Sequence, residues 1–174
     1  MPGFLGEISK SKVLKNFGEN KKKSLIVDKI ESKNYFLERR TINKFLNDKV
    51  FCDENYMVIT EGVILNSLNL IEKYRANDFK SAIIKMYETN GEKFFEEFRG
   101  SFSGLFYDKQ KDIWLIYTNH IGDKQIFYSK TKNGIIFGSG INYLVEYMRN
   151  NNIKYNFDKI GAYFLLTYGY MLED

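Results

Sequence analysis

The feature that most constrains the fold is a succession of strand-sized segments between residues 100 and 138. Within each segment, β-branched and aromatic residues alternate with a period of two, and clusters of Asp, Asn, Gly and Lys separate the segments. Such alternation is typical of strands, and the short polar clusters are typical of the turns that join them. The region therefore predicts a meander of antiparallel hairpins with strands at residues 101–107, 113–118, 125–129 and 135–137.

The predicted strand at residues 113–118 is apolar on both faces. Leu115 and Tyr117 share one face, whereas Trp114 and Ile116 share the other. A sheet that is apolar on both sides has to be covered on both sides. We therefore expect helices on each side of the sheet structure.

The remainder of the chain predicts a single α+β domain with antiparallel sheets. Its 174 residues suit one domain, and 17% of them are aromatic residues, which favour buried sheet surfaces. Apolar periodicities of 3.6 and 2 residues distinguish the expected helices from the expected strands. Further strands are predicted at residues 4–8, 24–30, 34–37 and 56–60, and helices at residues 79–87, 94–98, 141–147 and 157–166.

Composition argues against several functional classes. The net charge of +4 is too small to indicate a nucleic-acid partner, and no apolar segment approaches the ~20 residues of a membrane-spanning helix. Cys52 is the only cysteine, so the chain cannot form an internal disulfide. A lone thiol and the lack of a signal-peptide pattern predict a cytoplasmic protein.

Titratable residues outside any recognisable motif suggest no catalytic or metal site. His120 is the only histidine, so an imidazole-based site would have to be built on it, but it occurs in a predicted turn. The acidic residues at positions 88, 92, 96 and 97 fall on helical patterns and are interpreted as solvated helix surface. We predict no metal site.

Three segments, taken in order, carry a resemblance to a known family. Residues 58–66 (VITEGVILN) resemble an apolar strand followed by Asn-Gly-Glu-Ile-Tyr-Asn, and residues 98–108 (FRGSFSGLFYD) resemble Arg-Gly-x-Phe-Ala-Phe-x-x-x-Asp. Residues 119–128 (NHIGDKQIFY) are similar to Asp-Arg-x-Gly-x-Lys-Pro-Leu-Tyr-Tyr, with residues 137–140 where Phe-Ala-Ser-Glu would fall. Together they resemble the N-terminal glutaminase domain of asparagine synthetases, a class II glutamine amidotransferase of the N-terminal-nucleophile (Ntn) hydrolase fold.

The resemblance implies a specific architecture and domain arrangement. It implies a four-layer αββα sandwich, in which two antiparallel sheets stack between helical layers. Residues 1–166 would form the glutamine amidotransferase-like domain, and residues 167–174 would begin the linker to an ATP-dependent synthetase domain. ATP and Mg are then expected only in that synthetase domain, and no cofactor is expected in the domain described by this sequence.

Two positions depart from the family pattern. Family members attack the amide with an N-terminal cysteine whose free amino group serves as the base, and the corresponding position here is Pro2, which has no nucleophilic side chain. The family's oxyanion hole uses the side chain of an asparagine and the amide of the next glycine, and these positions resemble Glu61 and Gly62. An ionised Glu61 would oppose the developing negative oxygen. We therefore predict no catalytic residue.

Three residues resemble the substrate-binding residues of the family. Arg39 or Arg40 resembles the arginine that holds the glutamine carboxylate, and Asp78 resembles the aspartate that holds its amino group. Guanidinium and carboxylate groups suit these two partners. The alternative interpretation is structural, because the arginines end a predicted strand and Asp78 can cap a predicted helix. With Gly62, these residues form a vestigial substrate-binding set.

The sequence therefore favours a degenerate glutamine amidotransferase domain that does not hydrolyse glutamine and that serves as a scaffold for an ATP-dependent amide-forming domain of the same polypeptide. A module that binds or senses glutamine or another amino acid is one alternative. An active enzyme is another, either with a different native start or with the amine of Pro2 as a base. A homodimer is left open, and neither nucleic acid nor membrane is expected as a partner.

Overall fold

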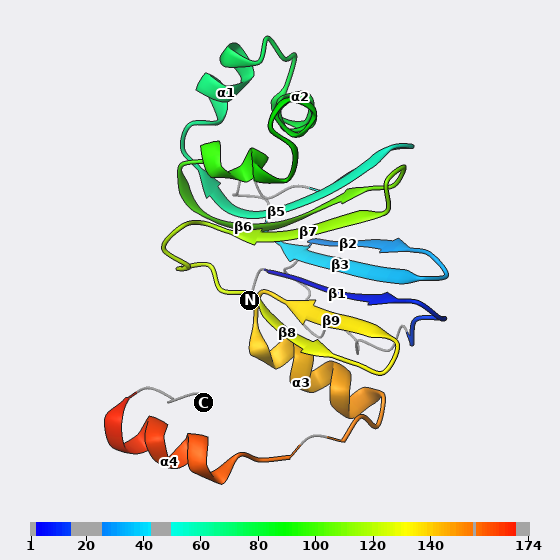
Figure 1. Ribbon diagram of the computed structural model, residues 1–174, viewed down its shortest axis with the longest axis vertical. Helices are drawn as coiled ribbons and strands as arrows, with labels where there is room; N and C mark the ends of the chain where they lie inside the picture. Colours follow the sequence, from blue (N-terminus) through cyan, green and yellow to red (C-terminus); the bar gives the residue numbers. More distant parts are fainter. Residues whose placement is uncertain (1–2, 15–25, 43–49, 155, 170–174) are drawn as a thin grey trace.

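The computed structural model describes residues 3–14, 26–42, 50–154 and 156–169, and within these ranges the chain forms two antiparallel sheets. In the first sheet the strand order is β2-β3-β1-β9-β8, and in the second it is β4-β5-β6-β7 (Figure 1). The first sheet consists of β1 (Gly3–Ser9), β2 (Ile26–Glu31), β3 (Tyr35–Thr41), β8 (Phe127–Lys130) and β9 (Gly134–Gly138). The second consists of β4 (Val50–Cys52), β5 (Tyr56–Ile64), β6 (Gly100–Asp108) and β7 (Ile113–Thr118).

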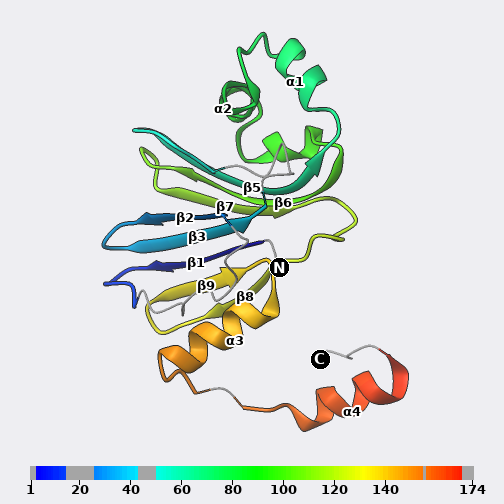
Figure 2. The same ribbon diagram turned by 180° about the vertical axis from the view of Figure 1, so that it is seen from behind.

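Helices cover the outer face of each sheet. The helices α1 (Ser67–Lys73) and α2 (Phe79–Asn90) and the 3₁₀ helix η1 (Gly91–Glu97) lie over the β4–β7 sheet, and α3 (Ile141–Asn150) lies under the other (Figures 1 and 2). The last helix, α4 (Lys159–Tyr168), stands apart below α3. None of the helices in the described ranges has the length and apolar character needed to cross a membrane.

Three hydrophobic clusters separate the four layers. One lies between α2, η1 and the β5–β7 sheet, and its rings include Phe94 and Phe106 at 5.1 Å between centroids. A second joins the two sheets through residues such as Phe4 and Leu105. The third packs α3 against the first sheet. The predicted αββα sandwich is thereby confirmed, because the period-two side chains of β1, β5 and β6 enter a different core on each face.

The predicted meander is wrong in one respect. Strands β6 and β7 pair with each other, and β8 pairs with β9, but β7 and β8 belong to different sheets. Residues 119–126 carry the chain from one sheet to the other. Strand β7 is an edge strand, and both of its apolar faces are covered, since Tyr117 packs under η1 while Trp114 and Ile116 pack between the sheets.

The predicted elements differ from the observed ones in number as well as in extent. Strand β5 was expected to end near Thr60 but continues to Ile64, and neither α1 nor β4 was predicted. The helix α4 runs across position 166, where the expected domain ends, and that boundary stays a prediction.

Candidate functional site: a cavity between the ends of the two sheets

A cavity of about 750 Å³ lies at one end of the sandwich. It opens where β5 and β6 of one sheet approach the end of β9 and the start of α3, and the link at residues 119–126 forms another side. This volume is within the range of small-molecule sites in proteins. Its polar walls include Glu61, Ser101, Ser103, Asp123, Lys124 and Ser139.

Gly62 shapes the wall that β5 contributes. Its φ of +100° is a conformation that L side chains rarely adopt, and a Cβ built on it would lie 2.2 Å from the carbonyl oxygen of Ser101. Only glycine therefore lets β5 approach β6 so closely at this point. The neighbouring Glu61 pairs in register with Ser103 of β6, so both side chains point to the same face of the sheet and both line the cavity.

Glu61 is a buried acid with a lysine opposite it. Its side chain is 10% exposed, and the Nζ of Lys124 lies 3.9 Å from its Oε1. Lys124 belongs to the link at residues 119–126, which is held to β7 because the hydroxyl of Thr118 donates a hydrogen bond to the Lys124 carbonyl oxygen at 2.7 Å. Lys124 therefore places a positive charge in the cavity lining, opposite Glu61, the acid of β5 that lines the cavity.

A second acid, Asp123, lies on the same link. The Ser101 hydroxyl hydrogen-bonds to its carboxylate and, with further hydrogen bonds from Asn119 and the Lys124 amide, holds the pKa of Asp123 below its ordinary value. Asp123 is therefore ionised at neutral pH.

The serines of the cavity differ in how their hydroxyls are used. The Oγ of Ser139 accepts a hydrogen bond from the backbone N–H of Phe4 at 2.9 Å, which joins the cavity wall to the start of β1. A Cβ on Gly3 would lie 2.5 Å from that same oxygen. The hydroxyl of Ser103, by contrast, is fully buried and has no hydrogen-bond partner among the described residues.

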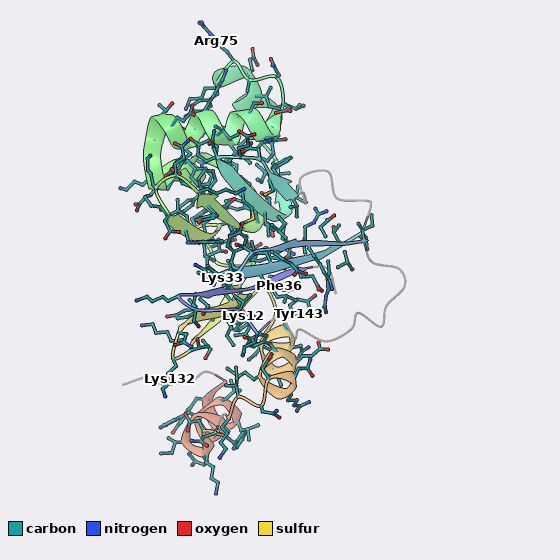
Figure 3. The ribbon with its side chains drawn as sticks, turned by 90° about the vertical axis from the view of Figure 1, so that its right-hand side faces the viewer. Lys12, Lys33, Phe36, Arg75, Lys132 and Tyr143 are labelled. Atoms are coloured by element: carbon teal, nitrogen blue, oxygen red, sulfur yellow. The ribbon has the colours of Figure 1, made fainter. Side chains whose placement is uncertain are left out.

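Arg40 lies behind the part of the cavity wall that Tyr143 forms. Tyr143 of α3 lines the cavity and packs beside the cluster that contains Phe36 (Figure 3). The guanidinium of Arg40 lies 5.0 Å from the centre of the Tyr143 ring, and its Nε donates to Glu38 at 2.5 Å. Burial raises the pKa of Tyr143, although Arg40 opposes this effect, so the phenol stays neutral at physiological pH.

Comparison with known proteins assigns the chain to a family. Residues 47–146, more than half of the chain, match the family described as glutamine amidotransferase domain. The chain belongs to this family. The sequence is also 30% identical over 108 residues to asparagine synthetase [glutamine-hydrolyzing] 2 of Bacillus subtilis. The aligned segment covers 59% of this chain and 14% of that protein. This confirms the predicted asparagine synthetase type of glutamine amidotransferase domain.

A solved structure supports the fold independently. Glutamine phosphoribosylpyrophosphate amidotransferase from B. subtilis, solved in complex with ADP and GMP, superimposes with a TM-score of 0.52 at 9% identity. The match covers 82% of this chain and 36% of that one. At this identity the likeness shows the Ntn-hydrolase-like fold alone. The amidotransferase domain described here spans only a minor part of the length of both relatives.

The structure brings only some of the predicted site residues of the amidotransferase domain together. Glu61 and Gly62, which resemble the oxyanion-hole positions of the family, both line the cavity, and their role there stays a prediction. Arg40 contacts the back of the Tyr143 ring, and one of its terminal nitrogens is buried with no hydrogen-bond partner within the described ranges. Pro2 lies outside the described residues, although Gly3, which follows it, packs against the cavity residues Ser139 and Tyr143.

The other two predicted substrate residues do not line the cavity. Arg39 forms a two-point ion pair with Asp28 of β2, with nitrogen–oxygen distances of 3.0 and 2.5 Å. Asp78 caps α2, because its carboxylate accepts a hydrogen bond from the backbone N–H of Ser81 at 2.7 Å. That helix lies on the outer face of the β4–β7 sheet, whereas the cavity opens between the sheets. Their role in substrate binding stays a prediction.

Several cavity residues were missed from the sequence. Lys124 and Ser103 fall inside two of the motifs that carry the family resemblance, but nothing in their spacing marked them as part of a site. Tyr143 carries no signal beyond a helical apolar pattern. Cys52 is exposed on β4 and does not line the cavity, and within the described ranges no group of three His, Cys, Asp or Glu side chains could hold a metal ion.

Proposed function

We propose that this glutamine amidotransferase domain does not hydrolyse glutamine and that it serves as a scaffold for an ATP-dependent amide-forming domain. One observation carries the proposal. The acid Glu61 is buried in the wall of the cavity, directly before Gly62, at the position where the family pattern has an asparagine that donates to the substrate oxygen.

The chemistry of amide hydrolysis explains why this residue matters. Attack on a carbonyl carbon places negative charge on its oxygen, and enzymes stabilise that charge with hydrogen-bond donors fixed in a site that excludes water. Losing one such donor typically slows catalysis by ~10²–10³-fold. A carboxylate at this position removes the donor and adds repulsion, so the N–H of Gly62 alone cannot shelter the oxyanion.

Among the described residues that line the cavity, no side chain is suited to activate a nucleophile. The only thiol of the sequence, Cys52, is exposed on β4, and the residue before Gly3 is Pro2. Three serines line the cavity, but none of the cavity residues is a histidine that could take a proton from them. Acyl transfer through this cavity is therefore unsupported on both counts.

The helix α4 supports the scaffold part of the proposal. Its apolar side chains face solvent rather than the sandwich, and Leu166 is 88% exposed. Exposed apolar side chains in such number on one helix favour interaction with another protein domain. The ATP-dependent domain of an asparagine synthetase-type polypeptide is the partner we propose, since the B. subtilis relative extends far beyond the matched segment. The exposed apolar residues of this segment are Phe157, Ile160, Tyr163, Leu165, Leu166 and Tyr168.

A glutaminase assay on the full chain tests the proposal. The purified protein is incubated with glutamine, and glutamate release is measured alongside asparagine synthetase 2 of B. subtilis as the active control. We expect release no faster than the uncatalysed background. Release at a rate comparable with the control, or a covalent adduct with a glutamine-mimicking electrophile on a cavity residue, would overturn it.

A further inference from the structure

We propose that the cavity binds a small molecule through a primary ammonium group, with Glu61 and Ser103 as the acceptors. The inference rests on the proposed function, because a cavity that shelters an oxyanion needs donors, whereas this one presents acceptors. The proposed ligand group donates hydrogen bonds, whereas the carbonyl oxygen of an amide accepts them.

The placement of the two acceptors is the first support. Glu61 and Ser103 are directly opposite in the β5–β6 register, so their side chains are neighbours on the face that lines the cavity. Glu61 is 7% exposed and Ser103 is 0% exposed. A single ammonium group has three N–H donors and no acceptor, which suits a carboxylate oxygen and a hydroxyl oxygen side by side.

The unused hydroxyl of Ser103 is the second support. It is fully buried on the cavity wall and has no hydrogen-bond partner among the described residues. Buried polar groups in folded proteins are nearly always hydrogen-bonded, and an exception calls for an explanation such as a ligand. We infer that a ligand nitrogen bound by Glu61 approaches this hydroxyl, because the two residues are opposite each other in the β5–β6 pair.

The charges around the cavity are the third support. Its lining holds two carboxylates, Glu61 and Asp123, and a single basic side chain, Lys124. Arg40, behind the wall, is already paired with Glu38. The lining therefore carries a net negative charge, which attracts a cation into a partly enclosed space.

Lys124 shows that an ammonium group fits the acid. Its Nζ lies 3.9 Å from Glu61, which is longer than a charge-assisted hydrogen bond, and its side chain is 39% exposed. Such a weak contact is readily exchanged for a ligand that makes shorter bonds. Lys124 acts in this arrangement as an internal competitor for the same acceptor.

The remaining walls favour a ligand with an apolar body. Val63, Phe127 and Ile141 line the cavity with Tyr143, and the volume of about 750 Å³ exceeds what a bare ammonium ion would fill. We therefore infer a primary amine on a hydrocarbon body of several carbons. Butylammonium is a suitable probe of this class, and butyramide and butyrate provide a neutral and an anionic molecule of similar shape.

Isothermal titration calorimetry on the full chain at about 50 mM salt tests the inference, since low ionic strength preserves the attraction between charges. We expect butylammonium chloride to bind at least about tenfold more tightly than butyramide, because a hydrogen bond to a charged group is worth about that factor. Butyrate is expected not to bind. Equal affinity for butylammonium and butyramide, or no binding of butylammonium, would overturn the inference.

Matched variants locate the binding to the proposed acceptors. Glu61→Gln keeps the shape of the side chain and removes its charge, and it is expected to weaken butylammonium binding at least about tenfold. Ser103→Ala is expected to weaken it less, and Lys124→Met is expected to strengthen it by removing the competitor. Glu72→Gln on the exposed face of α1 is the control and leaves binding unchanged. Circular dichroism confirms that each variant is folded, and unchanged binding in a folded Glu61→Gln variant would overturn the inference.

Glutamate release, measured on the same preparation, separates this inference from the proposed function. No release and no butylammonium binding would overturn only the ammonium site. Release of glutamate would overturn the silent-scaffold proposal, and with it the argument from missing donors on which the ammonium site rests, whatever the calorimetry shows.

Discussion

A Cβ on Gly62 would lie 2.2 Å from the carbonyl oxygen of Ser101, closer than a non-bonded carbon and oxygen can approach. The contact joins β5 to β6 at the cavity wall, and the φ of +100° at Gly62 adds a conformation that other residues avoid. Packing alone therefore requires glycine at position 62, whatever the role of its backbone N–H in the cavity.

Gly62→Ala is therefore expected to lower the free energy of unfolding by about 3 kcal/mol, because it combines backbone strain with a clash against main-chain atoms. Gly122→Ala is the matched control, since Gly122 has a φ of +67° but nothing within 4 Å of its virtual Cβ. It should cost about 1 kcal/mol. Urea denaturation measures both, and equal losses would show that the close approach of β5 and β6 does not limit this position.

The oxyanion and nucleophile positions can be tested together by restoring the family residues. The double variant Pro2→Cys with Glu61→Asn, made in a Cys52→Ser background, is expected to form a covalent adduct with a glutamine-mimicking electrophile. The reason is that Gly3, next to the introduced thiol, already packs against Ser139 and Tyr143 of the cavity.

Peptide mapping by mass spectrometry locates the adduct in that variant, and intact mass shows whether Met1 is removed. Pro2→Cys alone keeps the carboxylate of Glu61 and should react at least about tenfold more slowly, because the donor is still missing. A double variant that is folded, lacks Met1 and yet does not react would show that the cavity no longer supports acyl transfer.

Features of the fold that depend on residues close together in the sequence can be predicted from it, whereas features that depend on residues far apart cannot. The alternation in residues 101–107 and 113–118 depends on near neighbours, and it predicted β6 and β7 well. The placement of β1 between β3 and β9 does not, because it depends on contacts such as that of Phe4 with Ser139, 135 residues apart in sequence. Period-two patterns identify a strand but leave its partner undetermined, which is why β7 and β8 were wrongly joined.

The same reasoning applies to the cavity. Glu61 and Gly62 stand out in the sequence because they occupy one short motif, and both line the cavity. Local spacing also suggests Asp78 as a helix cap, which the structure confirms. Lys124, Ser103 and Tyr143 come from three different elements and meet only through the stacking of the two sheets. No local pattern marks such a meeting, so these residues could be found only from the structure.

Acid stability provides a further test, through Asp108 at the end of β6. Burial alone would raise the pKa of this carboxyl, but hydrogen bonds from the Lys111 and Gln110 amides and from the Tyr87 hydroxyl outweigh it and hold the pKa below its ordinary value. A carboxyl whose pKa is lower in the folded state stabilises the fold above its unfolded pKa, and that stabilisation is lost as the pH falls. The free energy of unfolding is therefore expected to decrease below about pH 4.

Asp108→Asn should flatten this part of the pH dependence, because the variant has no proton to take up at this position. Urea denaturation between pH 3 and 7 measures it, with Glu72→Gln as a surface control. A profile for Asp108→Asn as steep as that of the parent protein would show that the loss of stability in acid arises from other carboxyls.

The exposed face of α4 is the basis of the scaffold proposal and makes a prediction about stability. Ile160 and Leu166 are 70% and 88% exposed, so replacing both by Glu removes no buried contact with the sandwich. The free energy of unfolding should change by no more than about 0.5 kcal/mol, since surface substitutions rarely do more and Glu is a good helix former.

Leu144→Ala in α3, where the side chain is 8% exposed, is the contrasting change and should cost about 2–4 kcal/mol. Urea denaturation of the three proteins decides the matter: a large loss in the Ile160→Glu, Leu166→Glu variant would mean that α4 packs on its own domain, and the helix would then not be free to hold a partner.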